Sequence, residues 1–575
     1  MSLPVLATCV LVVLGLGYWL YGRRVARIFA PYDRQPTPAV QHADGADFVP
    51  TRPFYLLGQH FSAIAAAGPI AGPILACQQF GWLPCVLWIG FGVVLIGAVH
   101  DFTSLMASVR HGAHSVAEIA RENLGKRAWI AFVAFIWIAL VYVIVAFTDI
   151  TASTFVGHTD ELHGVPFNSG GAVAAATIAY LGLSIVMGLV QRRWNPPLWL
   201  MTILFVPATL GAVWLGTHVS SRFVFDVANP ARAWGLCIVA YCFVASLVPI
   251  WLLLQPRGYL GGFVLYMALA VGVIGVFSGR FPLQQPAFRD WTAVATDGAR
   301  TPLWPFLFVT IACGACSGFH GLVCSGTTSK QIVRERHCRP VGYGGMLLEA
   351  FVALIALSTI LVLAPGEVRG SPARIYGDGI GRYLTMVLGP ERLVFATTFG
   401  AMAFSTFVFD TLDVGTRLGR YLLQELFGAR GRVAAFFATL GTLVPPLVIL
   451  GTSPPTAPGQ RPAYMDYWLL FGTSNQLLAA LTLLAVTVWL YRSRRPIWYT
   501  LLPTVFVLGL TLWSLVLQVA ASIRGVARHG PGFDPVTVNG IAGVALIALA
   551  LTLVTEAIRA VQRTRAAGRE SLETA

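Results

Sequence analysis

The fold of this chain is decided by residues 54–78, which read FYLLGQHFSAIAAAGPIAGPILACQ. The stretch is apolar over about the 20 residues that a helix needs to cross a bilayer. Gly68-Pro69 and Gly72-Pro73 interrupt it, and proline removes a helical donor and clashes with the preceding turn. A break inside a bilayer is tolerated only where protein or a water-filled cavity covers it, as at the sites of many secondary transporters. The stretch therefore predicts a broken membrane span at a solute site, centred on Gly68 to Gly72.

A plainer interpretation of this stretch is a proline kink with a small-residue packing seam, since Gly68 and Gly72 have GxxxG spacing. We favour the break because two Gly-Pro pairs follow each other so closely. Exposed amides at the start of the second half-helix would suit a carboxylate, because helix amino termini favour anions. The predicted substrate contacts in this span are Gln59, His60, Ala67, Gly68, Pro69 and Gly72.

Composition excludes a soluble protein. Of the 575 residues 56% are hydrophobic and 11% are charged, whereas about a quarter of the residues in soluble domains are charged. The net charge of +14 is distributed between the apolar runs rather than gathered into one segment, so we expect membrane lipid and no nucleic acid as a partner. Lipid offers the backbone no hydrogen bonds, so the long apolar runs predict helices.

The apolar runs predict an all-α polytopic membrane protein with about 15 transmembrane helices. Lys and Arg concentrate after the odd-numbered spans, although the loop 255–260 contributes only Arg257. Positively charged loops stay cytoplasmic, so the amino terminus is expected outside and the carboxyl terminus in the cytoplasm. The expected spans are 3–21, 54–77, 84–109, 128–148, 170–190, 198–216, 233–254, 261–278, 304–325, 341–364, 394–412, 433–452, 466–490, 497–521 and 538–558.

These spans predict an inverted five-plus-five core with accessory helices around it. The first five-helix repeat is expected at 54–216 and the second at 217–412, and they enter the membrane from opposite sides, as inverted repeats do. The second repeat would open with the span 233–254, weakly interrupted at Pro249. Residues 1–53 are expected to hold an accessory helix and a cytoplasmic loop, and residues 413–575 accessory helices and a cytoplasmic tail.

A second unusual segment, residues 313–330, reads CGACSGFHGLVCSGTTSK. Its glycines permit close backbone approach, and its hydroxyl groups could bind a cation or a carboxylate. Helix packing and hydroxyls bonded to their own helix would also explain it. Cys313 and Cys316 form a C-x-x-C pair, but nothing nearby in sequence completes a metal or redox site, so no cofactor is expected. The predicted contributions are Ser317, Gly318 and His320 to the substrate site, and Ser325, Thr327 and Thr328 to ion coupling.

Ionisable residues inside the spans are candidates for coupling, because charge within a bilayer is costly. Asp101 leads, since its helix offers no basic partner other than His100 beside it, so it could carry a proton. Asp413 and Arg417 are four residues apart and are expected to form a structural ion pair. The remaining candidates within the spans are His60, His100 and Asp410 for coupling, His320, and Asp149 and Glu349 without an assigned role.

Seven segments, in order along most of the chain, match the motifs of a known family. They are GQHFSAIAAAGPIAGPILA (58–76), GAVHDF (97–102), LLLQPRGYL (252–260), ACGACSGFHGLVCSGTTSK (312–330), GYGGMLLEAFVALIAL (342–357), TLDVGTRLGRYLLQE (411–425) and LFGTSNQLLAAL (470–481). In these segments the chain resembles the carbon starvation protein A family of bacterial uptake transporters. It departs from the family at Gln59, where a second histidine is usual, and at Cys316.

The resemblance implies uptake of pyruvate or short peptides across the inner membrane, driven by a proton gradient and induced in carbon starvation. It also implies the five-plus-five core of the amino acid-polyamine-organocation superfamily. The sequence leaves open whether the substrate is pyruvate or a peptide, and whether the coupling ion is a proton or sodium. A membrane-embedded sensor without transport would need a soluble output domain, and an enzyme would need a nucleophile with a base or a metal cluster. The sequence shows neither, so we expect a transporter.

Overall fold

The computed structural model describes residues 2–30, 33, 35–44, 48–157, 159–162, 165–294, 300–452, 464–530, 532 and 534–573. These residues are almost all helical, which confirms the all-α prediction. The strands among them form two short antiparallel hairpins, β1 (Thr159–Leu162) with β2 (Val165–Asn168), and β3 (Thr292–Val294) with β4 (Arg300–Pro302).

The helices fall into three groups separated by the two hairpins. Before the first hairpin lie α1 (Leu3–Leu16), α2 (Gly22–Phe29), α3 (Pro38–Gln41), α4 (Pro53–Ile64), α5 (Gly68–Phe80), α6 (Trp82–Leu87), α7 (Ala98–Arg110), α8 (Val116–Leu124) and α9 (Lys126–Thr154). Between the hairpins lie α10 (Ser169–Trp194), α11 (Leu198–Val219), α12 (Pro230–Leu247) and α13 (Leu254–Phe277). After the second hairpin lie α14 (Leu303–Thr310), α15 (Gly318–Val323), α16 (Gly344–Leu361), α17 (Pro372–Leu388), α18 (Leu393–Leu426), α19 (Arg432–Thr452), α20 (Tyr464–Arg492), α21 (Trp498–His529) and α22 (Pro535–Glu573).

Short π-helical and 3-10 segments extend several of these helices. The π-helical segments are η1 (Gly17–Tyr21), η2 (Trp88–Gly97), η4 (Cys324–Thr328) and η7 (Arg339–Tyr343). The 3-10 segments are η3 (Ser220–Arg222), η5 (Ser329–Gln331), η6 (Glu335–His337) and η8 (Pro390–Arg392). Segment η2 joins α6 to α7 in one long span, and η4 continues α15.

Thirteen helices of the described chain are long and apolar enough to cross a membrane, and the bent pair α4 and α5 makes a fourteenth span. The fifteenth expected span, 304–325, is not one helix. Helix α14 ends at Thr310 and α15 begins only at Gly318, so the segment is broken in its middle. The expected span 233–254 is also divided, because α12 ends at Leu247 and α13 begins at Leu254. The division into inverted repeats stays a prediction.

The first predicted break is confirmed, but its place is different. Helix α4 ends at Ile64, α5 begins at Gly68, and the two are bent by 47°. The break therefore precedes the Gly68 to Gly72 stretch, which is helical. Pro69 lies in the first turn of α5, where a missing amide hydrogen costs no helical bond and proline favours helix initiation.

The two broken segments pack directly against each other. A Cβ atom on Gly68 would lie 2.4 Å from Cys313 Sγ, and one on Gly72 would lie 2.6 Å from the Thr310 carbonyl oxygen. A Cβ atom on Gly314 would lie 3.5 Å from Pro69 Cα. These glycines therefore bring the two interruptions together at backbone distance, which larger residues would prevent.

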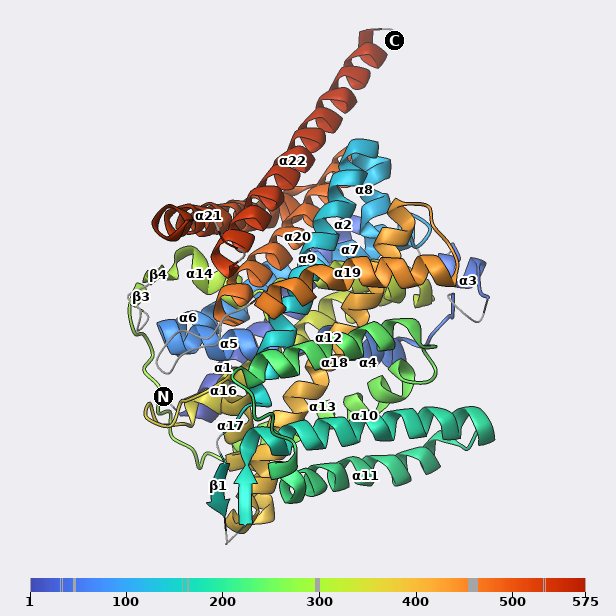
Figure 1. The fold of residues 1–575 in the computed structure, drawn as a ribbon. Helices are drawn as coiled ribbons and strands as arrows, with labels where there is room; N and C mark the ends of the chain where they lie inside the picture. The colour runs from blue at the N-terminus through green and yellow to red at the C-terminus, as the bar shows by residue number, and fades with distance from the viewer. Residues whose placement is uncertain are drawn as a thin grey trace.

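Helix α20 lies inside the bundle, whereas α10 and α11 form a hairpin at its edge (Figure 1). Of the residues in an apolar 18-residue stretch of the α20 span, 89% are buried, compared with 28% in the corresponding stretch of the α11 span. Gly472 of α20 contacts the broken segment closely, since a Cβ atom there would lie 2.0 Å from the Val309 carbonyl oxygen. Helix α20, which the sequence places among the accessory helices, is thus packed in the interior of the protein.

We expect Gly472→Ala to destabilise the protein by about 1–3 kcal/mol, because the new methyl group meets backbone that cannot move freely. The matched control is Gly509→Ala in the neighbouring helix α21, where nothing lies within 4 Å of the added Cβ atom. Thermal melting of the two purified variants in detergent measures the difference. Equal melting temperatures for both variants would contradict the close contact.

Candidate functional site

A chain of four buried ionisable side chains, which we call the His-acid chain, joins α7, α15 and α16. Asp101 Oδ1 lies 2.7 Å from His100 Nδ1, and Asp101 Oδ2 lies 2.9 Å from His320 Nδ1. The other ring nitrogen of His320 lies 3.1 Å from Glu349 Oε2. None of the four is more than 1% exposed. The structure thus brings together three residues that the sequence singled out and adds Glu349, to which no role was assigned.

Glycines set the distances within the His-acid chain. A Cβ atom on Gly97 would lie 2.1 Å from the Ala315 carbonyl oxygen, so the start of α7 touches the second break. Gly321 faces the His100 ring, with its would-be Cβ atom 3.3 Å from Nε2. Because α15 begins only at Gly318, His320 stands in its first turn, at the depth of Asp101. The break itself therefore positions the histidine.

His60 of α4 lies beside the His-acid chain. Its Nδ1 is 2.9 Å from Thr328 Oγ1, and its ring packs on Gly345, where a Cβ atom would lie 2.8 Å from His60 Cδ2. Gly345 and Glu349 are one turn apart on the same face of α16. Four buried atoms here have no hydrogen bond within the described residues, His60 Nε2, His100 Nε2 and both carboxylate oxygens of Glu349, although Oε2 is in ion-pair contact with His320. Such atoms are costly unless a proton, water or solute satisfies them.

Helix α20 pairs the backbone groups that the second break frees. Asn475 Oδ1 accepts from the Phe319 amide at 2.9 Å, and its Nδ2 donates to Ser317 Oγ at 3.0 Å and to Cys313 Sγ at 3.2 Å. Two more side chains of α20 donate to the last carbonyls of α14. Trp468, two turns before Asn475, donates from Nε1 to the Thr310 oxygen at 3.1 Å, and Gln476, the residue after Asn475, donates from Nε2 to the Phe308 oxygen at 3.3 Å.

The other predicted substrate contacts divide into buried and exposed residues. Ala67 and Pro69 are buried at the first break, and Ser317 and Gly318 are buried against Asn475 at the second. Gln59 is exposed and is not part of the buried group. Thr327 is exposed as well, and its hydroxyl donates to the Val323 carbonyl of its own helix. Gln59 and Thr327 therefore lie outside the buried group, as does the predicted coupling residue Asp410, which contacts Arg257.

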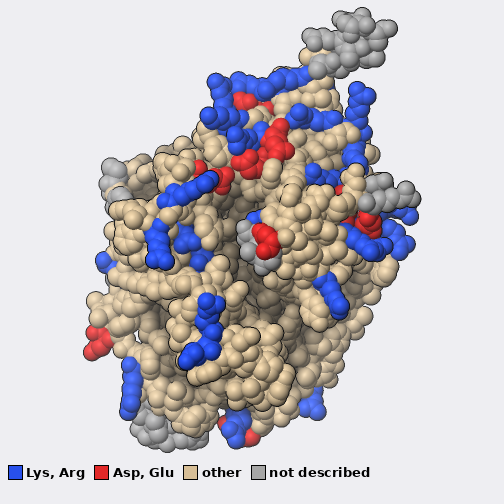
Figure 2. Space-filling model, turned by 90° about the vertical axis from the view of Figure 1, so that its right-hand side faces the viewer, with Lys and Arg blue, Asp and Glu red and all other residues tan. Residues whose placement is uncertain are grey.

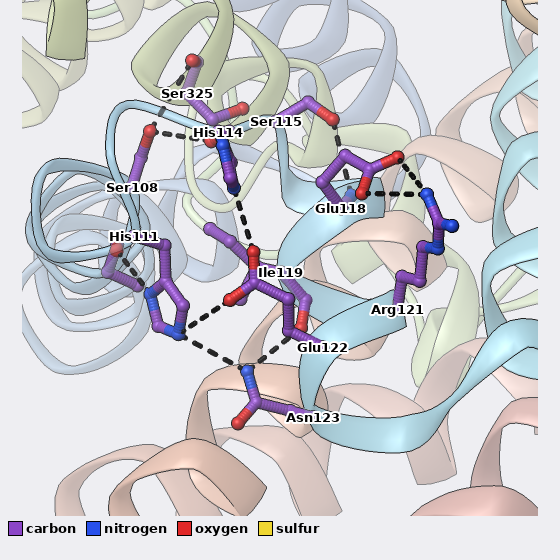
Figure 3. A network of polar contacts seen from close by, with 11 residues as sticks. Ser108, His111, His114, Ser115, Glu118, Ile119, Arg121, Glu122, Asn123 and Ser325 are labelled. Carbon is purple, nitrogen blue, oxygen red and sulfur yellow. Dashed lines mark hydrogen bonds and ion pairs between the residues drawn. The ribbon is translucent and has the colours of Figure 1, made fainter.

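Ser325 belongs to a different polar network, at the junction of α7 and α8 (Figure 3). Its hydroxyl accepts from the Val116 amide at 3.2 Å and donates to its own helix at Gly321, so the oxygen is occupied. Ser108 donates to the His114 carbonyl, and His114 Nδ1 lies 2.8 Å from Glu122 Oε1. This network holds α8 against the end of the site segment and gives Ser325 a structural contact, while its role in ion coupling stays a prediction.

The predicted ion pair between Asp413 and Arg417 is wrong. Asp413 contacts Arg257 Nη1, whereas Arg417 donates to the carbonyls of Ala245 and Val248 at the end of α12. Helix ends attract cations because their last carbonyls are unpaired. Arg257, expected in a loop, lies in α13 and is fully buried, with Asp410 as its second partner.

Sequence reasoning missed Arg257, Asn475 and the role of Glu349. The first two lie inside the motifs LLLQPRGYL and LFGTSNQLLAAL, so a polar residue within a matched apolar motif was the available signal. Among the described residues no group of three or more His, Cys, Asp or Glu is arranged to hold a metal ion.

Comparison with known proteins identifies the family. The family model described as "Carbon starvation protein CstA" matches residues 1–370 and 366–514. The chain belongs to this family. The "Peptide transporter CstA" of Campylobacter jejuni is 33% identical, over 90% of this chain and 80% of its own. The "Pyruvate/proton symporter BtsT" of Escherichia coli is 31% identical, over 88% of this chain and 80% of its own.

A solved manganese transporter of Eremococcus coleocola aligns with 91% of this CstA-family chain and 99% of its own, at 15% identity. Its TM-score is 0.46. The assignment to the family therefore depends on the sequence matches, and the assignment to a polytopic membrane protein on the spans.

We expect Asn475→Ala to destabilise the protein by about 1–3 kcal/mol, because the buried Phe319 amide would lose its acceptor. The control is Gln59→Ala, which removes an exposed amide of α4. Melting temperatures in detergent compare the two. If both variants melt with the wild type, Asn475 does not hold the second break.

Proposed function

We propose that this CstA-family protein is a secondary active transporter that imports a small carboxylate such as pyruvate, or short peptides, by proton symport. The relatives named as a peptide transporter and a pyruvate/proton symporter support the substrate class. The observation that carries the proposal is the His-acid chain, in which two carboxylates and two imidazoles are in contact with almost no exposure to solvent.

The side chains that make up the His-acid chain favour a proton over sodium as the coupling ion. Imidazole titrates near neutrality and passes a proton between its two nitrogens, and each contact of the chain joins a ring nitrogen to a carboxylate oxygen. Hard cations prefer sites built from oxygen alone. A proton bound anywhere along His100, Asp101, His320 and Glu349 is shared by neighbours within hydrogen-bond reach.

The two breaks favour a carboxylate as substrate. Helix α5 begins at Gly68 inside the bundle, where the amino end of its dipole attracts an anion. Cys313 adjoins Gly68 and is partly exposed, although it lies between two half-helices. Partial exposure at this depth supports an opening beside the breaks. A substrate carboxylate there would lie next to the second break, from which His320 follows directly in α15.

We further propose that the protein resides in the bacterial inner membrane with its amino terminus outside and its carboxyl terminus in the cytoplasm. The turns between α10 and α11 and between α18 and α19 lie on one side of the molecule (Figure 1). They carry exposed Arg192, Arg193, Arg430 and Arg432, and Lys and Arg are prominent over this face (Figure 2). Basic loops remain in the cytoplasm. The family description also suggests induction under carbon starvation.

We expect Asp101→Asn to abolish uphill uptake of labelled pyruvate or a dipeptide into proteoliposomes, while exchange across the membrane continues. Wild-type protein should accumulate substrate roughly tenfold per proton at a gradient of one pH unit, since one unit is worth about 1.4 kcal/mol. The control is Asp226→Asn, an exposed carboxylate before α12. Uptake driven by sodium alone, or unchanged proton-driven accumulation in Asp101→Asn, would overturn the proposed coupling.

We expect alkylation of Cys313 to block transport, because the thiol is partly exposed between the two breaks. Bound substrate should slow this alkylation. The exposed Cys9 and Cys237 are first replaced by serine, so that a membrane-permeant maleimide reports on the interior. Adding Cys313→Ser provides the insensitive control. Labelling of Cys313 at the same rate with and without saturating substrate would place the solute elsewhere.

A further inference from the structure

Arg257 is the centre of a second ionic group, which we call the Arg257 cluster. Its Nη2 lies 2.6 Å from Asp410 Oδ1, and its Nη1 contacts Asp413 Oδ2 and donates to the Phe409 carbonyl at 3.0 Å. The Tyr241 hydroxyl donates to Asp413 Oδ2 at 3.0 Å and accepts from Arg257 Nη1 at 2.9 Å. One guanidinium is therefore shared by two carboxylates that are one turn apart on α18.

The charges of this cluster do not balance. One cation faces two carboxylates, and the remaining titratable side chains around it, Tyr180 and Tyr241 with Cys242, are neutral when protonated. Arg417, the next basic side chain on α18, directs its guanidinium to the end of α12. Among the described residues Arg257 is thus the one cation in ion-pair contact with the two carboxylates, and Arg417 attracts Asp413 only from a distance. An uncompensated charge inside a bilayer is expensive, so a positive ion should complete the cluster.

The two carboxylates differ in what they can bind. Asp413 is 1% exposed, and its Oδ1 is buried without a hydrogen-bond partner in the described chain. Asp410 is 29% exposed at its side chain and is therefore the more accessible of the two carboxylates. Its Oδ2 faces Gly261, where a Cβ atom would lie 3.0 Å from that oxygen and 3.2 Å from the Tyr180 hydroxyl. Glycine at 261 leaves this oxygen uncovered, and Asp410 is therefore the accessible acceptor.

We propose that Asp410 is a second proton-binding carboxylate of the transporter, in addition to the His-acid chain, whose proton stays essential for any uphill uptake. This inference rests on the proposed proton symport and deepens it. A proton passes from hydronium to Oδ2, so that one O–H bond of hydronium breaks, one O–H bond forms on Asp410 and water is released. This neutralises Asp410 and leaves Arg257 paired one to one with Asp413.

Proton binding at Asp410 would act on the contact between helices. Arg257 ties α13 to α18, Tyr241 connects α12, and the Tyr180 hydroxyl of α10 donates to the Arg257 carbonyl at 2.7 Å. Neutral Asp410 attracts Arg257 less strongly than the carboxylate does, so α13 is held less tightly against α18. The His-acid chain uses α7, α15 and α16 instead. Two sets of helices thus each hold one proton site, and we infer two protons per transport cycle.

The experiment measures the proton-to-substrate ratio in proteoliposomes whose membrane potential is clamped to zero. With two protons, a gradient of one pH unit sustains roughly hundredfold accumulation, and with one proton roughly tenfold. Wild type should reach the higher limit and Asp410→Asn the lower one, and Asp410→Glu should restore the ratio of two. Asp226→Asn is the matched control.

The outcomes separate the two proposals. Absence of any proton flux with substrate in wild type would overturn the proposed function itself. A ratio of one in wild type, or a ratio of two in Asp410→Asn, would overturn the second site and leave proton symport standing. A sodium gradient that replaces the second proton would also overturn it. The wild-type ratio decides even if Asp410→Asn does not fold, and retained substrate exchange shows whether that variant is folded.

Discussion

The structure depends on one constraint, that peptide groups freed inside a bilayer must find partners within the protein. Residues 65–67 and 311–317 interrupt two apolar spans, and both interruptions are placed against each other at glycines. Helix α20 meets the second interruption with Trp468, Asn475 and Gln476 and pairs the carbonyls and the amide that the break exposes. Because this sealing helix follows the broken segments by more than a hundred residues, the site forms only when the whole chain has packed.

The His-acid chain is a consequence of the same interruption. Since α15 begins at Gly318, His320 stands close to the break, and glycines at positions 97 and 321 let α7 approach until Asp101 reaches it. The energetic cost of the broken helix is offset by α20, and what remains is a group of histidines and carboxylates held together away from water. Histidines and carboxylates in such an environment can exchange a proton among themselves and with a solute beside the break.

The two charged groups solve the problem of buried charge differently. In the His-acid chain, histidines that can gain or lose a proton neighbour each carboxylate, so the total charge can adjust. In the Arg257 cluster the cation is permanent, because arginine keeps its proton in proteins. Adjustment there can only come from the carboxylates. Of the two carboxylates, Asp410 is the more exposed and is therefore the one that we expect to gain and lose a proton.

The sequence by itself determined the all-α membrane architecture and the presence of the first break, because hydropathy and proline act over a single span. It also pointed to Asp101, His60 and His320 as rare ionisable residues in apolar surroundings. Tertiary structure decided where each break lies and which polar residues meet. His320 and Asp101 are 219 residues apart, and Asn475 is 156 residues from Phe319. Spacing along a helix predicts only neighbours three or four residues away, which is why Arg417 was expected beside Asp413 and Arg257 was not. The packing of distant helices at glycine contacts, which no local pattern encodes, chose the actual partners.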